Sequence, residues 1–129
     1  MTGKTSVKIM NMNILYVDDE KDLLELASSF FEDENIPLDT SHDFHQALEL
    51  IRNKKYDLII SDVRMPSGSG LELIAKAREE GKFSGKFILV SGDLKSQDEA
   101  KKAGCNLMMN KPLDFFALID SVKELLQNK

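Results

Sequence analysis

The chain has 129 residues, which is the size of one domain with a single hydrophobic core. Its composition, 42% hydrophobic and 30% charged, is typical of a folded globular protein and excludes extended disorder. A net charge of -5 argues against direct binding to nucleic acid, and the one cysteine, Cys105, excludes an internal disulfide. Because no apolar run approaches the ~18 residues of a membrane span, we expect a cytoplasmic protein without direct membrane contact.

The order of apolar and polar residues divides the chain into a short arm and one domain. Residues 1–12 mix polar and scattered apolar positions, so we expect a flexible N-terminal arm or an expression remnant there, followed by a domain over residues 13–129. Within that domain, short apolar segments alternate with amphipathic ones. Five β–α units predict an α/β fold with a parallel sheet covered on both faces. The predicted strands are residues 13–17, 37–40, 58–61, 87–90 and 107–109.

Four of the amphipathic segments have apolar residues at helical spacing. The segment over residues 96–103 differs, because it offers only Ala100 and Ala103 to the core, and we expect that helix to be lightly anchored and mobile. The predicted apolar faces of the other four are Leu23, Leu24, Ala27, Phe30 and Phe31; Phe44, Ala47, Leu48 and Ile51; Leu71, Ile74, Ala75 and the aliphatic stem of Arg78; and Phe115, Leu118, Ile119, Val122 and Leu126.

Polar residues follow four of the predicted strands, at the edge where open parallel sheets bind ligands. Three carboxylates gathered there would repel one another unless a cation compensated for their charge, and Mg²⁺ prefers such oxygen ligands. A carboxylate can also attack phosphorus, while a lysine and a hydroxyl contact the phosphoryl oxygens. The pattern therefore predicts a magnesium-dependent phosphoryl site. Its residues are Asp18 and Asp19 after the first strand, Asp62 after the third, Ser91 after the fourth and Lys111 after the fifth.

Taken in order, these motifs resemble the signature of response-regulator receiver domains, the CheY-like superfamily. The motifs are residues 14–20 (ILYVDDE), residues 61–66 (SDVRMP), Ser91-Gly92 and Lys111-Pro112. The resemblance covers the chain from Asn13 to the last predicted helix. It implies a flavodoxin-like (βα)5 sandwich whose five-stranded parallel sheet has the strand order 2-1-3-4-5. It also implies a cis bond between Lys111 and Pro112.

The resemblance further implies roles for the site residues. Asp62 would be the phosphoacceptor, Ser91 the hydroxyl that follows the phosphoryl group, and Lys111 the cation that contacts it. The implied Mg²⁺ ligands are the carboxylates of Asp18, Asp19 and Asp62 with the backbone carbonyl of Arg64.

The implied function is that of a receiver in a two-component system. Such a protein takes a phosphoryl group from the phosphohistidine of a sensor histidine kinase or a histidine phosphotransfer protein, and slowly hydrolyses it. The change of conformation then controls a downstream partner or a linked output domain, and can drive formation of a homodimer. By this resemblance the chain is a signalling phosphoacceptor and not an enzyme with a separate substrate. A free-standing receiver and a piece of a larger regulator both stay open.

Two other functions fit parts of the pattern. A phosphatase of the haloacid dehalogenase type also uses a strand-end Asp and Mg²⁺, but it needs an Asp-x-Asp motif, and the second place here is Arg64. A pseudo-receiver binds partners without carrying phosphate, but such proteins usually lack one of the acids or the Lys, and this chain lacks none.

Three details near the predicted site carry expectations of their own. Met108 stands three residues before Lys111, where many receivers have an aromatic residue, which puts the usual aromatic switching in doubt. The stretch 67–70 (SGSG) is interpreted as a flexible link, because it lacks the spacing of a phosphate-binding loop. Arg64 and Asp93 both follow site residues by two positions, and we expect them to form an ion pair across the mouth of the pocket.

Overall fold

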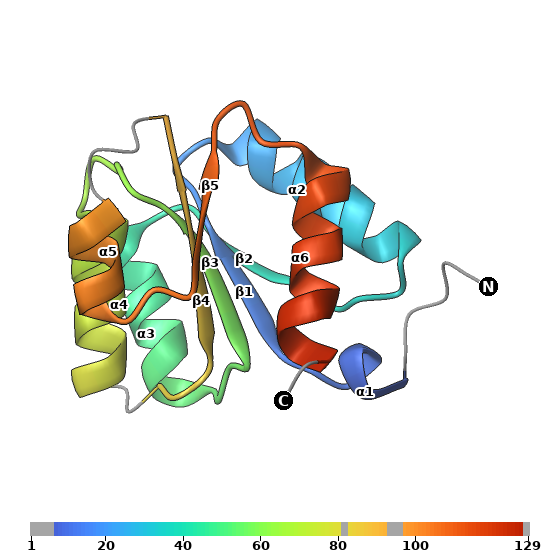
Figure 1. Cartoon of the computed structure of the whole chain (residues 1–129), viewed down its shortest axis with the longest axis horizontal. Helices are drawn as coiled ribbons and strands as arrows, with labels where there is room; N and C mark the ends of the chain where they lie inside the picture. Colours follow the sequence, from blue (N-terminus) through green and yellow to red (C-terminus); the bar gives the residue numbers. More distant parts are fainter. Residues whose placement is uncertain (1–6, 81–82, 93–96, 128–129) are drawn as a thin grey trace.

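The computed structural model describes residues 7–80, 83–92 and 97–127 of the chain (Figure 1). Its five strands form one parallel sheet with the order β2-β1-β3-β4-β5, which confirms the predicted fold class and strand order. The elements are α1 (Val7–Met10), β1 (Ile14–Val17), α2 (Lys21–Asp33), β2 (Asp39–Ser41), α3 (Phe44–Asn53), β3 (Leu58–Asp62), α4 (Gly70–Glu79), β4 (Lys86–Ser91), α5 (Gln97–Ala103), β5 (Leu107–Asn110) and α6 (Phe115–Gln127).

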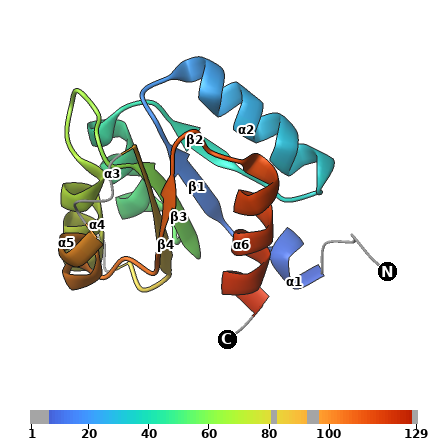
Figure 2. The same cartoon turned by 45° about the horizontal axis from the view of Figure 1, so that its top comes forward.

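Every predicted strand is present, and the largest difference is in β2, which begins at Asp39 instead of Pro37. Every residue of β1 and β3 is buried, as expected for strands that are covered on both faces. Helices α3, α4 and α5 lie on one face of the sheet, and α1, α2 and α6 lie on the other (Figures 1 and 2). None of the described helices is long and apolar enough to cross a membrane.

The predicted apolar faces of α3 and α6 are confirmed, since their predicted residues are all buried. The face predicted for α4 was partly wrong: Leu73 and Ala77 are buried with Ile74, whereas Ala75 is exposed. Both pairs, Leu71 with Ala75 and Leu73 with Ala77, flank Ile74 at helical spacing, so only the packing of the helix against the sheet decides which pair is buried.

Helix α5 has the light anchoring that its sequence predicted. Among its residues Gln97–Ala103, only Ala100 is fully buried, while Ala103 is partly buried. Ser96, the predicted first residue of this helix, lies outside the described part of the chain.

The sequence did not predict α1, a short helix over Val7–Met10. Its Ile9 is fully buried in the apolar cluster between the sheet and helices α2 and α6. The domain boundary placed at residue 13 stays a prediction, but residues on its N-terminal side also contribute to the core.

The connection from β3 to α4 is closely packed, in contrast to the flexible link expected from its SGSG sequence. The Ser67 hydroxyl accepts a hydrogen bond from the backbone N–H of Phe44 at 2.9 Å, which fastens the connection to the start of α3. A Cβ atom at Gly70 would collide with the carbonyl oxygen of Asp62, so the absence of a side chain allows α4 to begin directly beside the end of β3. Ser69 caps α4 by accepting the N–H of Glu72 at 3.0 Å.

Candidate functional site

The backbone of the sheet brings the predicted site residues to one edge. The N–H of Asp18 donates to Ser41 at 3.0 Å, so the hydrogen bonding of β1 to β2 continues past the end of the strand. On the other side, the N–H of Lys111 donates to the carbonyl of Ser91 at 2.9 Å. Asp62 ends the central strand β3, where it pairs with Val90 of β4. The positions of these residues are therefore determined by the register of the sheet.

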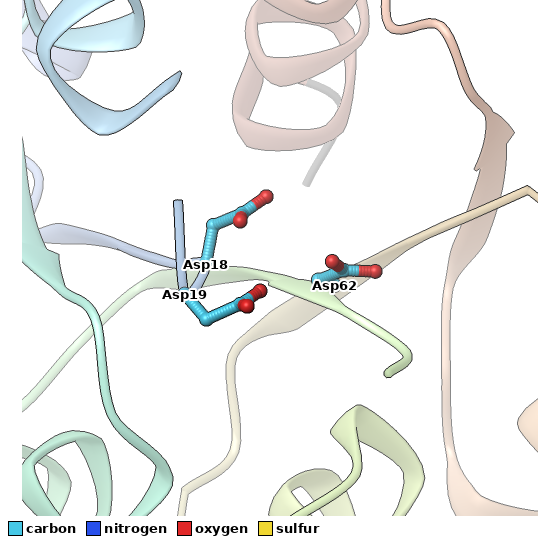
Figure 3. Close-up of side chains that lie close together, drawn as sticks. All are labelled: Asp18, Asp19 and Asp62. Carbon is cyan, nitrogen blue, oxygen red and sulfur yellow. The ribbon is translucent and has the colours of Figure 1, made fainter. Parts of the chain in front are cut away.

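Three carboxylates meet at this edge (Figure 3). One oxygen from each of Asp18, Asp19 and Asp62 lies within 4.8 Å of the others. Asp18 and Asp62 are 1% and 5% exposed, whereas Asp19 is exposed to solvent. Oδ2 of Asp18 is buried and has no hydrogen-bond partner among the described residues. Since buried charges need compensation, this donor set fits a hard divalent cation such as Mg²⁺.

The surroundings of Asp18 make its ionised form costly. Burial raises the pKa of its carboxyl to about 6, and the neighbouring charge of Asp62 acts in the same direction. A hydrogen bond from the N–H of Glu20 to Oδ1 at 2.9 Å, and the charge of Lys111, act in the opposite direction without offsetting the burial. A cation at the site would supply the missing compensation.

Lys111 supplies one positive charge within this cluster. Its Nζ lies 2.7 Å from Oδ2 of Asp62. Burial acts to lower the pKa of Lys111, but the hydrogen bond and the charge of Asp62, together with Asp18, outweigh it and raise the pKa. Lys111 therefore stays protonated at neutral pH. The bond from Lys111 to Pro112 is cis, as the resemblance implied.

An open pocket of about 430 Å³ lies at this edge of the sheet. Among the residues that line it, Ser91 is buried and Arg64 is exposed. The N–H of Arg64 lies 3.4 Å from Oδ1 of Asp62, a long hydrogen bond that directs this backbone segment toward the acid. Asp93 lies outside the described residues, so its ion pair with Arg64 stays a prediction. The pocket is lined by Asp19, Glu20, Asp62, Arg64, Ser91, Gly92 and Lys111.

Met108 and Tyr16 are two further side chains whose surroundings the structure shows. Met108 is partly buried and packs against the apolar cluster on the α3–α5 side of the sheet. Tyr16, for which the sequence predicted only a place in a strand, is fully buried two positions before Asp18. Burial raises the pKa of its hydroxyl, and the charges of Asp18 and Asp62 add to that rise, so the group stays protonated. The sequence did contain a sign of this buried hydroxyl, because Tyr16 is the only polar residue in the otherwise aliphatic strand β1.

Comparisons with known proteins agree with the fold and the acidic pocket. The family model for the response regulator receiver domain matches residues 14–123. An uncharacterized 14.6 kDa protein of Leptolyngbya boryana is 32% identical over 119 residues, covering 90% of this chain and 91% of that protein. Response regulator ArlR of Staphylococcus aureus is 28% identical over 90% of this chain, but the chain spans only 53% of its length. The probable transcriptional regulator ycf29 of Porphyra purpurea is 28% identical, with 91% of this chain and 57% of that protein covered.

Solved structures of response regulators have the same fold as this chain. The CheY-like receiver domain protein of Methanospirillum hungatei has a TM-score of 0.84 at 27% identity, over 90% of this chain and 94% of its own. A two-component response regulator of Clostridium difficile has a TM-score of 0.84 at 26% identity, over 92% and 98% of the two chains. Because the family model covers most of the chain, and the sheet order and acidic pocket agree with it, this chain belongs to the response regulator receiver domain family of two-component systems.

Proposed function

We propose that Asp62 accepts a phosphoryl group from a phosphohistidine, in a reaction that requires Mg²⁺. The donor is a sensor histidine kinase or a histidine phosphotransfer protein. The observation that carries this proposal is the 2.7 Å contact between Nζ of Lys111 and Oδ2 of Asp62, beside two more carboxylates within 4.8 Å. A buried acid that is paired with a mobile cation and flanked by metal ligands is suited to hold a phosphoryl group.

The transfer needs positioning and charge neutralisation more than proton transfer. A carboxylate oxygen of Asp62 forms the new P–O bond while the P–N bond of the phosphoimidazole breaks, and its electron pair returns to the imidazole nitrogen. Lys111 moves from the carboxylate to a phosphoryl oxygen, and the Ser91 hydroxyl donates to another. Mg²⁺, when bound, neutralises the charge on the phosphoryl oxygens. Its ligands would be Asp18, Asp19 and Asp62, with the backbone carbonyl of Arg64.

The readout of phosphorylation is a change at the surface formed by α5, β5 and α6. Ser91 ends β4, and its engagement with the phosphoryl group pulls on the segment that leads to α5. That helix has one fully buried residue, Ala100, so little packing opposes its movement. Met108 borders a pocket that Gln97 and Ala100 of α5 also line, and its flexible side chain can take a second position there. The output is control of a partner protein or a linked domain. Water later hydrolyses the aspartyl phosphate, which is the only turnover that we propose.

The test is the intact mass of the protein after incubation with Mg²⁺ and acetyl phosphate or beryllofluoride. We expect an adduct of phosphoryl or beryllofluoride mass on the wild type and none on Asp62→Asn. Asp120→Asn, which removes an exposed carboxyl from α6, is the matched control and should keep the adduct. A folded wild type that binds Mg²⁺ yet forms no adduct would contradict the proposal and favour a pseudo-receiver.

A further inference from the structure

Tyr16 carries a buried hydroxyl that no known part of the site uses. Its side chain has 0% exposure and lies in the apolar cluster between the sheet and helices α2 and α6. Within the described part of the chain, its hydroxyl oxygen has no hydrogen-bond partner. A buried tyrosine hydroxyl usually has such a partner, because leaving a polar group unpaired away from water is costly. The position of this hydroxyl therefore needs an explanation.

Asp18, the residue that directly follows β1, presents the complementary group. Successive side chains of a strand alternate between faces, so Tyr16 and Asp18 project from the same face of the sheet at this end. Oδ1 of Asp18 accepts the N–H of Glu20 at 2.9 Å. Oδ2 is buried and has no partner among the described residues. Among the described residues, only these two buried side-chain atoms, one a donor and the other an acceptor, are unpaired, and the acceptor belongs to a residue of the acidic cluster itself.

We propose that Tyr16 is a positioning residue for the metal site, whose hydroxyl donates a hydrogen bond to a bridging water that in turn donates to Oδ2 of Asp18. This inference rests on the proposed function through its Mg²⁺ site. With Oδ1 held by the N–H of Glu20, a second donor on Oδ2 fixes the rotation of the carboxylate. Hydrogen bonds to a metal-binding carboxylate orient it before the ion arrives, which strengthens binding.

The substitution Tyr16→Phe removes the hydroxyl and keeps the ring that fills the core. The dissociation constant for Mg²⁺ is measured by isothermal titration calorimetry on the full chain, with circular dichroism as the check of folding. Because a water-mediated hydrogen bond to a charged group is removed, we expect the dissociation constant to rise roughly tenfold. Tyr56→Phe is the matched control: it removes a buried tyrosine's hydroxyl that donates to Asp39 at 2.7 Å, at the opposite edge of the sheet. It should leave the Mg²⁺ affinity unchanged.

A double-mutant cycle tests whether the effect acts through Asp18. In an Asp18→Ala background, where the acceptor is gone, Tyr16→Phe should cause no further loss of Mg²⁺ affinity. The inference is overturned if Tyr16→Phe binds Mg²⁺ as the wild type does, or if the loss is as large without Asp18 as with it. A wild type that binds no Mg²⁺ would overturn both this inference and the metal requirement of the proposed function. Mg²⁺ binding without an adduct on Asp62 would count against the phosphoacceptor alone.

Discussion

The two edges of the sheet satisfy their polar groups in different ways. At the carboxyl edge, three carboxylates meet, and a buried oxygen of Asp18 has no partner among the described residues. At the amino edge, Oδ2 of Asp39 accepts hydrogen bonds from the Tyr56 hydroxyl at 2.7 Å and from Lys54 at 2.8 Å. These three groups of the amino edge compensate one another, whereas the acids of the carboxyl edge fit a cation that would compensate them.

Arg78 is a second group at the amino edge whose hydrogen bonds are satisfied within the protein. Its guanidinium lies over the Phe83 ring at 5.1 Å and donates to three backbone carbonyls, those of Phe83, Gly85 and Gly104, at 3.2, 3.1 and 2.7 Å. Gly104 has a φ of 100°, and a Cβ atom there would collide with Nε of Arg78, so glycine is required by both the backbone and the contact. Arg78 thus joins the end of α4 to the segments that precede β4 and β5. Hydrogen bonds between neighbouring elements therefore lie at the amino edge, whereas the acids gather at the carboxyl edge.

The largest effect on stability should come from the amino edge. Arg78→Met keeps most of the apolar stem but leaves three carbonyls without their donor, so we expect a loss of about 3 kcal/mol in the free energy of unfolding, measured by urea denaturation. Arg52→Met is the matched control, because Arg52 is 47% exposed and forms only surface ion pairs, with Glu49 and Glu80, and should cost less than about 1 kcal/mol. Equal losses in the two variants would show that the carbonyl contacts of Arg78 stabilise the fold no more than surface ion pairs do.

At the carboxyl edge, the substitution Asp18→Asn should raise the free energy of unfolding instead of lowering it. Burial raises the pKa of Asp18 to about 6 from 3.8, so the folded protein binds this proton more tightly than the unfolded chain does. In the absence of metal, the contribution of Asp18 to stability therefore grows as the pH falls through 6 and is complete below 3.8. At pH 7 the metal-free Asp18→Asn variant should be more stable than the wild type by on the order of 2 kcal/mol.

That stabilisation should be accompanied by weaker Mg²⁺ binding, and it should disappear below pH 4, where the wild-type carboxyl is itself neutral. Urea denaturation with a chelator at several pH values measures it. Asp19→Asn, at an exposed position of the same cluster, is the control and should change stability little. A metal-free Asp18→Asn protein that is less stable than the wild type at pH 7 would show that the buried charge of Asp18 does not destabilise the fold.

The smallest effect is expected at Tyr56. Burial opposes ionisation of Asp39, but the hydrogen bonds from Lys54 and Tyr56 outweigh it and lower the pKa of Asp39. Its contribution to stability is therefore present above the ordinary value of 3.8 and is lost as the pH falls through the lowered value. Tyr56→Phe should lower the free energy of unfolding by about 1 kcal/mol at pH 7, measured by urea denaturation. The loss should be smaller at a pH low enough to protonate Asp39. A loss that did not depend on pH would assign the effect to packing instead.

The layout of the fold, and the edge of the sheet at which the acids gather, follow from the sequence alone. Alternating apolar and amphipathic segments specify β–α units, and right-handed crossovers then bring the carboxyl ends of all the strands to one edge. Polar residues that end those strands, such as Asp18 and Asp62, must therefore meet, however far apart they are in the chain. The apolar faces of α3 and α6 were also predictable, because a helix with one continuous apolar stripe has only one way to bury it.

Which polar groups have hydrogen-bond partners depends instead on how the layers pack. The periodicity of α4 fits two apolar faces, and packing chose the one with Leu73 and Ala77. The sequence predicted only a packed aliphatic stem for Arg78, whereas in the folded chain its guanidinium donates to three carbonyls. The same packing buries the hydroxyl of Tyr16, two residues before Asp18. The periodicity of apolar residues in the sequence predicts only which residues of one helix or strand share a face. Hydrogen-bond partners depend on distances between elements that are remote in sequence, and those distances exist only once the layers are packed.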